Sequence, residues 1–367
     1  MAAYIWPSYT GDEPRTRIFW EEGIGEWQTV KNTAPKDNGY FWNRKPLWGY
    51  QNEADPGVME FQIREALNYG VNVFIYDWYW YDGRPFLENC LNDGFLKAAN
   101  SRDMRFYLMW ANHDAGYTWD KRNAGRVEST VWRGTCSPED FERIGKHWIQ
   151  DYFCRENYYR IDGKPVVSIY DLNNFVRSFG GTEETKRAME RLNREAVKTG
   201  LPGVHFQFIR WNGKSENLTG VDGEVIETTP ELVSQLGFSS LTHYQFVHFA
   251  DIDRDYREIL PDVYKEWDRI DREFAIPYYP HVSIGWDNNP RFKDFRPGIV
   301  RNNTPEAFEE ALRAAKQFAE KRGLPLVTIN SWNEWTETSY LEPDDLNGYG
   351  YLEAVRRVFI GKGDLEK

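Results

Sequence analysis

The feature that most constrains this fold is an alternation of short apolar segments with helix-forming segments along the whole chain. Apolar runs bounded by turn residues predict buried strands, and the stretches between them carry residues that favour helix ends. The order is strand then helix throughout, without a linker or a change of composition. The eight predicted strands span residues 3–9, 72–80, 105–112, 165–172, 204–211, 239–246, 276–286 and 324–329.

The predicted helices begin at residues that favour helix N-termini. Pro56 opens a helix that ends near residue 69. Ser137-Pro138 and Thr304-Pro305 each place an N-cap residue before a proline at the first helical position. Gly323 follows the second of these helices as a stop signal, after Lys321. Further helices are expected from Pro85 and over residues 183–198, 252–274 and 348–359.

Eight successive strand–helix units in 367 residues predict the α/β class and a single (β/α)8 TIM barrel. Residues 10–55 form an extended insertion between the first strand and the first helix, and residues 1–367 are expected to form one catalytic domain. A doubly wound open sheet is the alternative, but it has no need of eight units. Gly23-Ile24-Gly25 precedes no helix pattern and lacks the rest of a nucleotide-binding fingerprint.

The eighth strand runs into the sequence Asn330-Ser331-Trp332-Asn333-Glu334-Trp335-Thr336-Glu337. In an extended chain, Glu334 and Glu337 would point to opposite faces, roughly 10 Å apart. If the chain turns helically at Trp335, the pair lies on one side with Cβ atoms about 5–6 Å apart. That separation suits a retaining glycosidase, whose carboxyl groups stand roughly 5–5.5 Å apart. The motif therefore predicts a pair of acids at the C-terminal mouth of the barrel.

The predicted strand ends pair aromatic residues with amide, carboxylate or imidazole groups. Stacking surface beside hydrogen-bonding groups suits a polyhydroxylated ligand, and a barrel places its site at these ends. Asn333 and Tyr340 are expected to donate hydrogen bonds that keep Glu334 ionised. The residues expected to contact a carbohydrate substrate are Trp6, Tyr9, Asp77, Trp78, Tyr79, Asn112, Tyr244, Trp286, Asp287, Asn333 and Tyr340.

Composition and motifs exclude several other functions. A net charge of −12 and a pI near 5.2 argue against a nucleic-acid partner. No run approaches the ~18 apolar residues of a membrane span. No zinc spacing, P-loop or serine-hydrolase elbow is present, so no cofactor and no metal ion are expected. The acidic run Glu342-Pro343-Asp344-Asp345 lacks an EF-hand pattern and is interpreted as a solvated loop.

The chain start leaves the compartment open. Met1-Ala2-Ala3 leads directly into the first strand, without a signal peptide. Both a cytoplasmic protein and a secreted or periplasmic one whose export signal has been removed fit this start. The sequence does not determine the oligomeric state.

The motifs resemble a known family. Asn333-Glu334-Trp335-x-Glu337, followed by Tyr340-Leu341-Glu342-Pro343, is similar to the signature of the WbsX-like proteins and of glycoside hydrolase family 99. Thr336 stands where family 99 commonly has a histidine, and Thr338 stands where a small residue is common. Four further segments agree with the family in order, namely residues 74–80, Met109-Trp110-Ala111-Asn112, Ile161-Asp162-Gly163-Lys164-Pro165 and Gly285-Trp286-Asp287-Asn288-Asn289-Pro290-Arg291.

The resemblance implies a (β/α)8 fold and a retaining α-mannosidase or mannanase that uses no metal. It assigns to Glu334 the base that activates the 2-hydroxyl of the sugar, giving a 1,2-anhydro sugar, and to Glu337 the general acid and later base. The usual retaining route, in which a carboxylate attacks the sugar directly, stays open. A glycosyltransferase of surface polysaccharide synthesis is the second hypothesis, although no diphosphate-binding motif is evident. A sugar-binding barrel without catalysis is the third.

Overall fold

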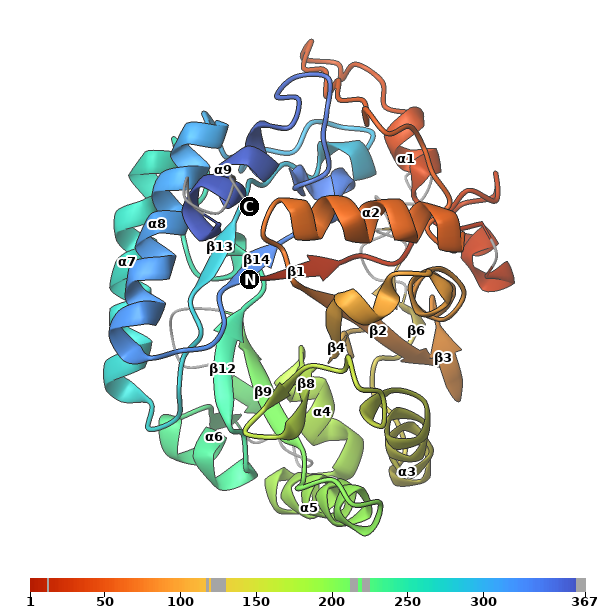
Figure 1. The fold of residues 1–367 in the computed structure, drawn as a ribbon, viewed down its shortest axis with the longest axis vertical. Helices are drawn as coiled ribbons and strands as arrows, with labels where there is room; N and C mark the ends of the chain where they lie inside the picture. Colours follow the sequence, from red (N-terminus) through yellow and green to blue (C-terminus); the bar gives the residue numbers. More distant parts are fainter. Residues whose placement is uncertain (12, 117–118, 120–129, 212–216, 220–224, 361–367) are drawn as a thin grey trace.

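Eight parallel strands form a nearly closed barrel in the computed structural model, which describes residues 1–11, 13–116, 119, 130–211, 217–219 and 225–360 (Figure 1). The predicted α/β barrel is therefore confirmed. Neighbouring strands follow the order β12-β9-β8-β4-β2-β1-β14-β13. The strands are β1 (Ala2–Ile5), β2 (Val73–Tyr81), β4 (Arg105–Trp110), β8 (Lys164–Ile169), β9 (His205–Arg210), β12 (Ser240–His243), β13 (His281–Ser283) and β14 (Thr328–Asn330).

The last seam of the barrel, between β12 and the segment before β13, is held by a short ladder. The backbone N–H of Leu241 donates to the carbonyl of Pro277 at 2.9 Å, and the N–H of Tyr279 donates to the carbonyl of Leu241 at 2.8 Å. Leu241 and Tyr278 form the only bridge recorded there among the described residues. Within the described residues, the barrel closes at this seam with fewer paired residues than at its other strand pairs.

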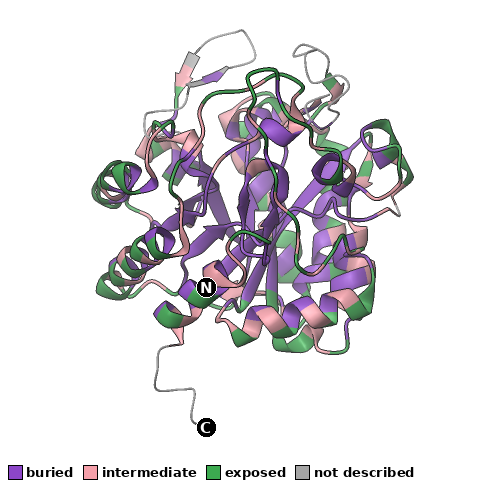
Figure 2. Cartoon of the chain, turned by 90° about the horizontal axis from the view of Figure 1, so that it is seen from above, coloured by how far each residue is buried: buried purple, intermediate pink, exposed green. Residues whose placement is uncertain are grey.

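Helices surround the barrel, with their exposed faces outward and the buried strands at the centre (Figure 2). The predicted caps are present: the Ser137 and Thr304 side chains accept from backbone N–H groups inside their helices, and Gly323 ends the second helix at φ 64°. Within the described residues, no helix has the length and apolarity to cross a bilayer. The α-helices of the described residues are α1 (Trp27–Lys31), α2 (Pro56–Asn68), α3 (Pro138–His147), α4 (Leu172–Phe179), α5 (Thr182–Lys198), α6 (Pro230–Leu236), α7 (Tyr256–Glu273), α8 (Pro305–Arg322) and α9 (Gly350–Phe359).

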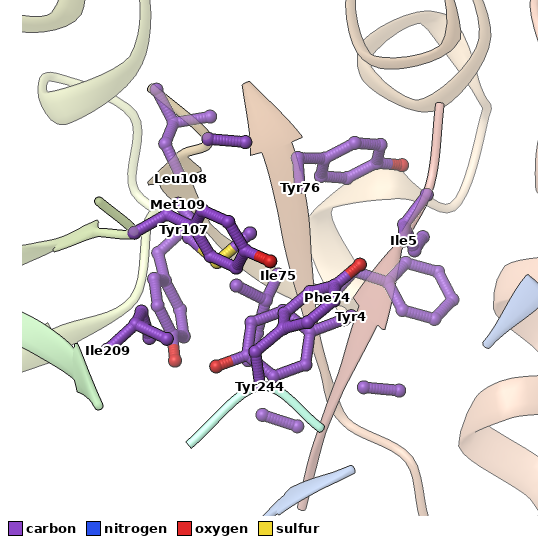
Figure 3. Close-up of a cluster of buried hydrophobic side chains, with 14 of the residues drawn as sticks. Tyr4, Ile5, Phe74, Ile75, Tyr76, Tyr107, Leu108, Met109, Ile209 and Tyr244 are labelled. Carbon is purple, nitrogen blue, oxygen red and sulfur yellow. The ribbon is translucent and has the colours of Figure 1, made fainter. Parts of the chain in front are cut away.

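Polar side chains cross the barrel interior. The Tyr107 hydroxyl donates to Gln207 Oε1 at 3.1 Å, and Ser168 Oγ donates to the same oxygen at 2.8 Å. On the other side, the Thr328 hydroxyl lies 2.9 Å from that of Thr242. Aromatic rings fill the space beside these polar groups, and Figure 3 shows Tyr4 beside Tyr244, with ring centroids 4.8 Å apart. The interior is a packed core that forms the floor under the barrel mouth.

The helix predicted near Pro85 is wrong. Pro85 lies in β3 (Arg84–Phe86), which pairs antiparallel with the end of β2, so that Trp80 faces Pro85. The turn residues Asp82 and Gly83 have φ of 53° and 69°, which suits a two-residue hairpin. The sequence Asp-Gly between aromatic segments is the signal that was overlooked. The chain then forms short turns, η2 (Cys90–Gly94), η3 (Phe95–Lys97) and η4 (Ser101–Asp103).

Several strands are shorter than predicted at their C-terminal ends. The first ends at Ile5 rather than residue 9, and the fourth ends at Ile169 because Asp171 caps helix α4. The predicted insertion between β1 and α2 is present and contains α1 and one turn, η1 (Pro14–Ile18). Smaller elements outside the barrel are β5 (Ala115–Gly116), β6 (Thr130–Trp132), β7 (Arg160–Ile161), β10 (Asn217–Thr219), β11 (Val225–Glu227), η6 (Trp148–Phe153), η7 (Phe246–His248) and η8 (Asn289–Arg291).

Candidate active site

A compact strap, defined as residues 331–342, follows β14 and carries the two glutamates. It contains β15 (Asn333–Glu334), the 3-10 turn η9 (Trp335–Glu337) and β16 (Ser339–Tyr340). The backbone N–H of Glu334 donates to Ser331 Oγ at 2.7 Å, and that hydroxyl donates to the Ser339 carbonyl at 2.7 Å. The helical turn brings Glu334 and Glu337 to one side of the strap. The structure thus has the helical turn at Trp335 and not the extended chain, the other alternative that the sequence left open.

Arg291 joins the two glutamates to a third carboxylate. Its Nη2 donates to Glu334 Oε1 at 2.8 Å, its Nη1 donates to Glu337 Oε1 at 2.6 Å, and its Nε donates to Glu26 Oε1 at 3.1 Å. The arginine side chain is only 12 % exposed. Glu26, from the insertion, is fully buried and also accepts the indole N–H of Trp6. One guanidinium therefore holds three carboxylates, with each nitrogen paired to a different acid.

Burial and mutual repulsion control the protonation of this group. Burial raises the pKa of Glu334 well above its ordinary value, the negative charge of Glu337 raises it further, and Arg291 opposes both effects. Burial also raises the pKa of Glu337, again against the lowering effect of Arg291. Two acids beside one guanidinium therefore titrate as a pair that retains a proton at a higher pH than free carboxyl groups.

A cavity of about 340 Å³ opens beside Glu337 and Arg291. Arg291 is the one guanidinium or ammonium group among the described residues that line it, and burial lowers the pKa of His113, so that this imidazole is neutral near pH 7. The wall is mainly aromatic, which suits the C–H faces of a sugar. The lining residues are Trp6, Asp77, Tyr79, Met109, Ala111, His113, Asp114, Trp119, Tyr170, Trp211, Tyr244, Arg291 and Glu337.

Asp77 and Tyr244 form a polar pair on this wall. The Tyr244 hydroxyl donates to Asp77 Oδ2 at 2.9 Å and lies 3.5 Å from Glu334 Oε2. Burial raises the pKa of Asp77 well above its ordinary value, against the lowering effect of the Tyr244 hydrogen bond. Asp77 Oδ1 has no hydrogen-bond partner among the described residues. The pair links the cavity wall to the acids of the strap.

Of the predicted contact residues, Trp6, Asp77, Tyr79 and Tyr244 line the cavity. Trp78 does not. It points under the helices, where its indole N–H donates to Glu88 Oε1 at 2.6 Å and its ring packs against Trp148 at 5.2 Å between centroids. The strand period of two explains this, because Asp77 and Tyr79 face the mouth and Trp78 between them faces outward. Trp286 is half-buried and also lies outside the cavity lining.

Asn333 and Tyr340 do not donate to Glu334, so that expectation is wrong. The Asn333 amide donates to the Trp6 carbonyl at 3.0 Å and to Glu53, while its oxygen accepts the Trp6 N–H. The Tyr340 hydroxyl donates to Asp344 Oδ2 at 2.7 Å, and its ring stacks on Trp335. Both side chains hold the strap, and Arg291 is the residue that donates to Glu334 and lowers its pKa, against the larger raising effect of burial.

Three further predicted residues have structural partners instead of facing the cavity. The Asn112 amide donates to the Asp171 carbonyl at 2.7 Å and fixes the turn after β8. Asp287 accepts from Asn289 and from Tyr40, and its backbone N–H donates to the Glu337 carbonyl at 2.8 Å. The Tyr9 hydroxyl accepts the backbone N–H of Trp335 at 3.1 Å. Tyr9 and Asp287 therefore contact the strap, whereas Asn112 joins the ends of β4 and β8.

Sequence reasoning gave no role to Glu26 and Arg291. Arg291 stands at the end of the Gly285-to-Arg291 motif, so the resemblance contained a signal that was not used. Glu26 lies in the insertion, and no local pattern distinguishes it from neighbouring acids. The described residues also contain no group of three or more His, Cys, Asp or Glu side chains arranged to hold a metal ion.

Comparison with known proteins identifies one matching family and two solved structures with a similar fold. A family model described as "Glycosyltransferase WbsX" matches residues 2–355. A protein named "Uncharacterized protein WxcX" from Xanthomonas campestris pv. campestris is 26 % identical over 357 residues, which are 96 % of this chain and 48 % of that protein. The chain thus spans about half the length of the curated relatives that it matches.

Among solved structures, the family 99 endo-α-mannosidase from Bacteroides thetaiotaomicron aligns with a TM-score of 0.59 and 14 % identity. The alignment covers 97 % of this chain and 95 % of that chain. A glycoside hydrolase-like protein aligns with a TM-score of 0.56 and 16 % identity, covering 87 % and 89 %. At these identities the comparison establishes the shared barrel fold.

Proposed function

The chain belongs to the WbsX family, and we propose that it is a retaining glycoside hydrolase that cleaves an α-linked glycan or polysaccharide, similar to an α-mannosidase or mannanase. The observation that carries this proposal is the pairing of Glu334 and Glu337 on one guanidinium beside an aromatic cavity. Two acids held this close, at the mouth of a barrel, are the arrangement that retaining glycosidases use.

The ionisation of the pair supports this chemistry. A retaining hydrolase needs one carboxylate and one carboxylic acid at the pH at which it works. Burial raises the pKa of both glutamates, and Arg291 stabilises the carboxylate that remains. A pair that shares one proton follows from these opposing effects.

From the family resemblance, we assign the base or nucleophile to Glu334 and the general acid to Glu337. In the site without substrate the charge of Glu337 raises the pKa of Glu334, so this assignment requires the proton that the pair shares to lie on Glu337 when the sugar is bound. In the first step, the bond between the anomeric carbon and the leaving oxygen breaks as Glu337 gives its proton to that oxygen. The anomeric carbon is attacked either by the Glu334 carboxylate or by the sugar 2-oxygen, whose proton Glu334 then takes. In the second step, Glu337 removes a proton from water as the water oxygen attacks the anomeric carbon. In the covalent route the bond to Glu334 breaks and frees its carboxylate, and in the anhydro route the bond to the 2-oxygen breaks as Glu334 returns its proton to that oxygen.

The charge of the cavity favours a hydrolase over a glycosyltransferase that uses a nucleotide sugar. Such a donor carries a diphosphate, which needs cations or free backbone donors. Among the described lining residues Arg291 is the one permanent cation, and carboxylates already occupy its Nε, Nη1 and Nη2. A binding barrel without catalysis is disfavoured because it has no need of two acids on one arginine.

The test uses Glu334→Gln and Glu337→Gln on a natural α-glycan and on an activated aryl α-glycoside. Glu334→Gln should lower kcat/KM by about 10³-fold or more on both substrates, because the variant lacks the base or nucleophile needed for attack on the anomeric carbon. Glu337→Gln should be most damaging with the natural glycan, because an aryl group leaves without a proton. Equal losses for Glu337→Gln on the two substrates would reject its acid role. An active Glu334→Gln variant would reject the mechanism.

A further inference from the structure

A second group of acids lies behind the strap, on the side away from Arg291. Glu53, from the end of the insertion, and Glu342, from the end of the strap, are 1 % and 4 % exposed. Gln62 of α2 lies between them, and its amide nitrogen donates to Glu53 Oε1 at 3.3 Å and to Glu342 Oε1 at 3.0 Å. We call these three residues the rear network. The acidic sequence around Glu342 predicted a solvated loop. That prediction is wrong for Glu342, which is buried.

The rear network binds the residues on both sides of Glu334. The Asn333 amide donates to Glu53 Oε2 at 2.9 Å and Oε1 at 3.1 Å. The Trp335 indole donates to Glu342 Oε2 at 2.6 Å, and the Trp332 indole donates to Gln62 Oε1 at 3.0 Å. Glu334 itself points the other way, to Arg291. The neighbours of the candidate base are thus fixed by one buried group that does not touch the cavity.

The ionisable groups around the rear network are acids. Cys90 of η2 contacts Glu53, with its sulfur 3.7 Å from Oε2, and the phenols of Tyr76 and Tyr9 lie in the field of Glu53. Among the described residues, none of the hydrogen-bond or ion-pair partners of the two glutamates is a cation. Burial raises the pKa of Glu53 to about 7. Burial and then the charge of Glu53 raise the pKa of Glu342 well above its ordinary value.

We propose that Glu53 and Glu342, bridged by Gln62, are positioning residues that hold Glu334 in its working position from behind the strap. The inference rests on the proposed hydrolase function for its kinetic consequence, but its structural part stands without it. Glu53 acts through Asn333, whose amide also clamps the Trp6 backbone at the end of β1. Glu342 acts through Trp335, the first residue of the turn that separates the two catalytic glutamates.

The protonation states give the network a defined behaviour. The pKa of Glu342 is raised well above its ordinary value by burial and by the charge of Glu53, whereas Glu53 becomes ionised as the pH rises through about 7. An ionised Glu53 accepts more strongly from Asn333 and Gln62 than the protonated form does. The environment of the strap, including the indole of Trp335, should therefore change with a midpoint near pH 7.

The first arm of the test needs no substrate. Protein labelled with 5-fluorotryptophan is titrated from pH 5 to 9 by ¹⁹F NMR, with the Trp335 resonance assigned by Trp335→Phe. The wild-type Trp335 resonance should titrate near pH 7, and Glu53→Gln should abolish this titration. Glu342→Gln should shift the resonance across the whole range, because its hydrogen-bond partner has changed.

The matched control is Glu88→Gln. Glu88 also accepts an indole N–H at 2.6 Å, from Trp78, but it lies under the helices and has no contact with the strap among the described residues. This variant should leave both the Trp335 titration and the kinetics at wild-type values. A shift of the Trp335 resonance in Glu88→Gln as large as that in Glu342→Gln would overturn the inference.

The second arm measures kcat and KM. Glu53→Gln and Glu342→Gln should each lower kcat about tenfold while KM stays within about twofold, because the network positions Glu334 without touching the substrate. A Trp335 titration that Glu53→Gln abolishes supports the network even if no glycoside is hydrolysed, and that result would reject only the proposed function. Hydrolysis with wild-type kcat in both variants, together with an unresponsive Trp335 resonance, would reject the network and keep the function.

Discussion

The two acidic groups on either side of the strap differ in one respect that explains their behaviour. In front, Glu26, Glu334 and Glu337 surround Arg291. Behind, Glu53 and Glu342 surround the neutral amide of Gln62. Both groups are buried, so burial raises carboxyl pKa values on both sides. Only the front has a cation that stabilises ionised carboxylates among the described partners, and only the front lies beside the cavity, so the front is suited to proton transfer to a substrate while the rear holds the strap.

Removing the cation should have the largest effect. Arg291→Gln leaves three buried carboxylates without a positive partner, so we expect kcat/KM to fall about 10³-fold and the free energy of unfolding to fall by about 3–5 kcal/mol. Enzyme kinetics and chemical denaturation measure the two effects. Arg296→Gln, an exposed arginine on the same segment, is the control. If Arg291→Gln retained wild-type kinetics, the front would not depend on its arginine.

The rear group should reveal itself in the pH dependence of stability. The carboxyl group of Glu53 has a pKa of about 7 in the folded state, whereas its ordinary value is 4.5. The folded state therefore binds more protons, and stability present below pH 4.5 is lost as the pH rises through about 7, by about 3 kcal/mol. Glu53→Gln should lose correspondingly less stability than wild type between pH 5 and 8, as measured by denaturation at both pH values. Parallel losses in the two proteins would contradict this.

The third carboxylate of the front should tune the other two. Its negative charge raises the pKa of both Glu334 and Glu337. Glu26→Gln should therefore move both limbs of the kcat/KM–pH profile to lower pH by about one unit and reduce the maximum about tenfold. Glu22→Gln, at an exposed position of the same insertion, serves as the control. A profile displaced to higher pH would show that Glu26 acts by another route.

The smallest effect is expected at the edge of the front group. Tyr244→Phe removes the hydroxyl that donates to Asp77 and lies near Glu334. We expect kcat/KM to fall about fivefold, which corresponds to a loss of about 1 kcal/mol of transition-state stabilisation. Tyr256→Phe removes another buried hydroxyl, which donates to the Ser283 carbonyl and does not line the cavity. It should change stability but not kcat/KM. Indistinguishable kinetics of the two variants would remove Tyr244 from the site.

Much of the fold followed from local patterns. The N-cap and proline pairs at Ser137-Pro138 and Thr304-Pro305 open helices in the structure, because cap chemistry involves neighbouring residues only. The error at Pro85 had a local remedy in Asp82-Gly83. That residues 1–367 act as one domain, and that Glu334 and Glu337 are catalytic, stay predictions.

The assignment of side chains to faces was less predictable. Trp78 and Tyr79 are adjacent aromatics at the same strand end, yet only Tyr79 lines the cavity, because the strand alternation sends Trp78 under the helices. Asn333 was expected beside Glu334 and instead bonds to Trp6 and Glu53, because the strap folds back on itself through its pairing with Tyr340. A pattern names candidates at a strand end but does not say which way the chain turns there.

The sequence alone determined the barrel and the position of Glu334 and Glu337 at the end of its last strand, because periodicity, caps and a short motif are local properties. Only the tertiary structure decided what surrounds those acids. Arg291 lies 43 residues before Glu334 and Glu53 lies 280 before Asn333, and their meeting depends on the closure of the barrel and the path of the insertion. Long-range pairing of charges has no periodic trace in the sequence, so its effect on pKa values and on the strap becomes visible only when the chain is folded.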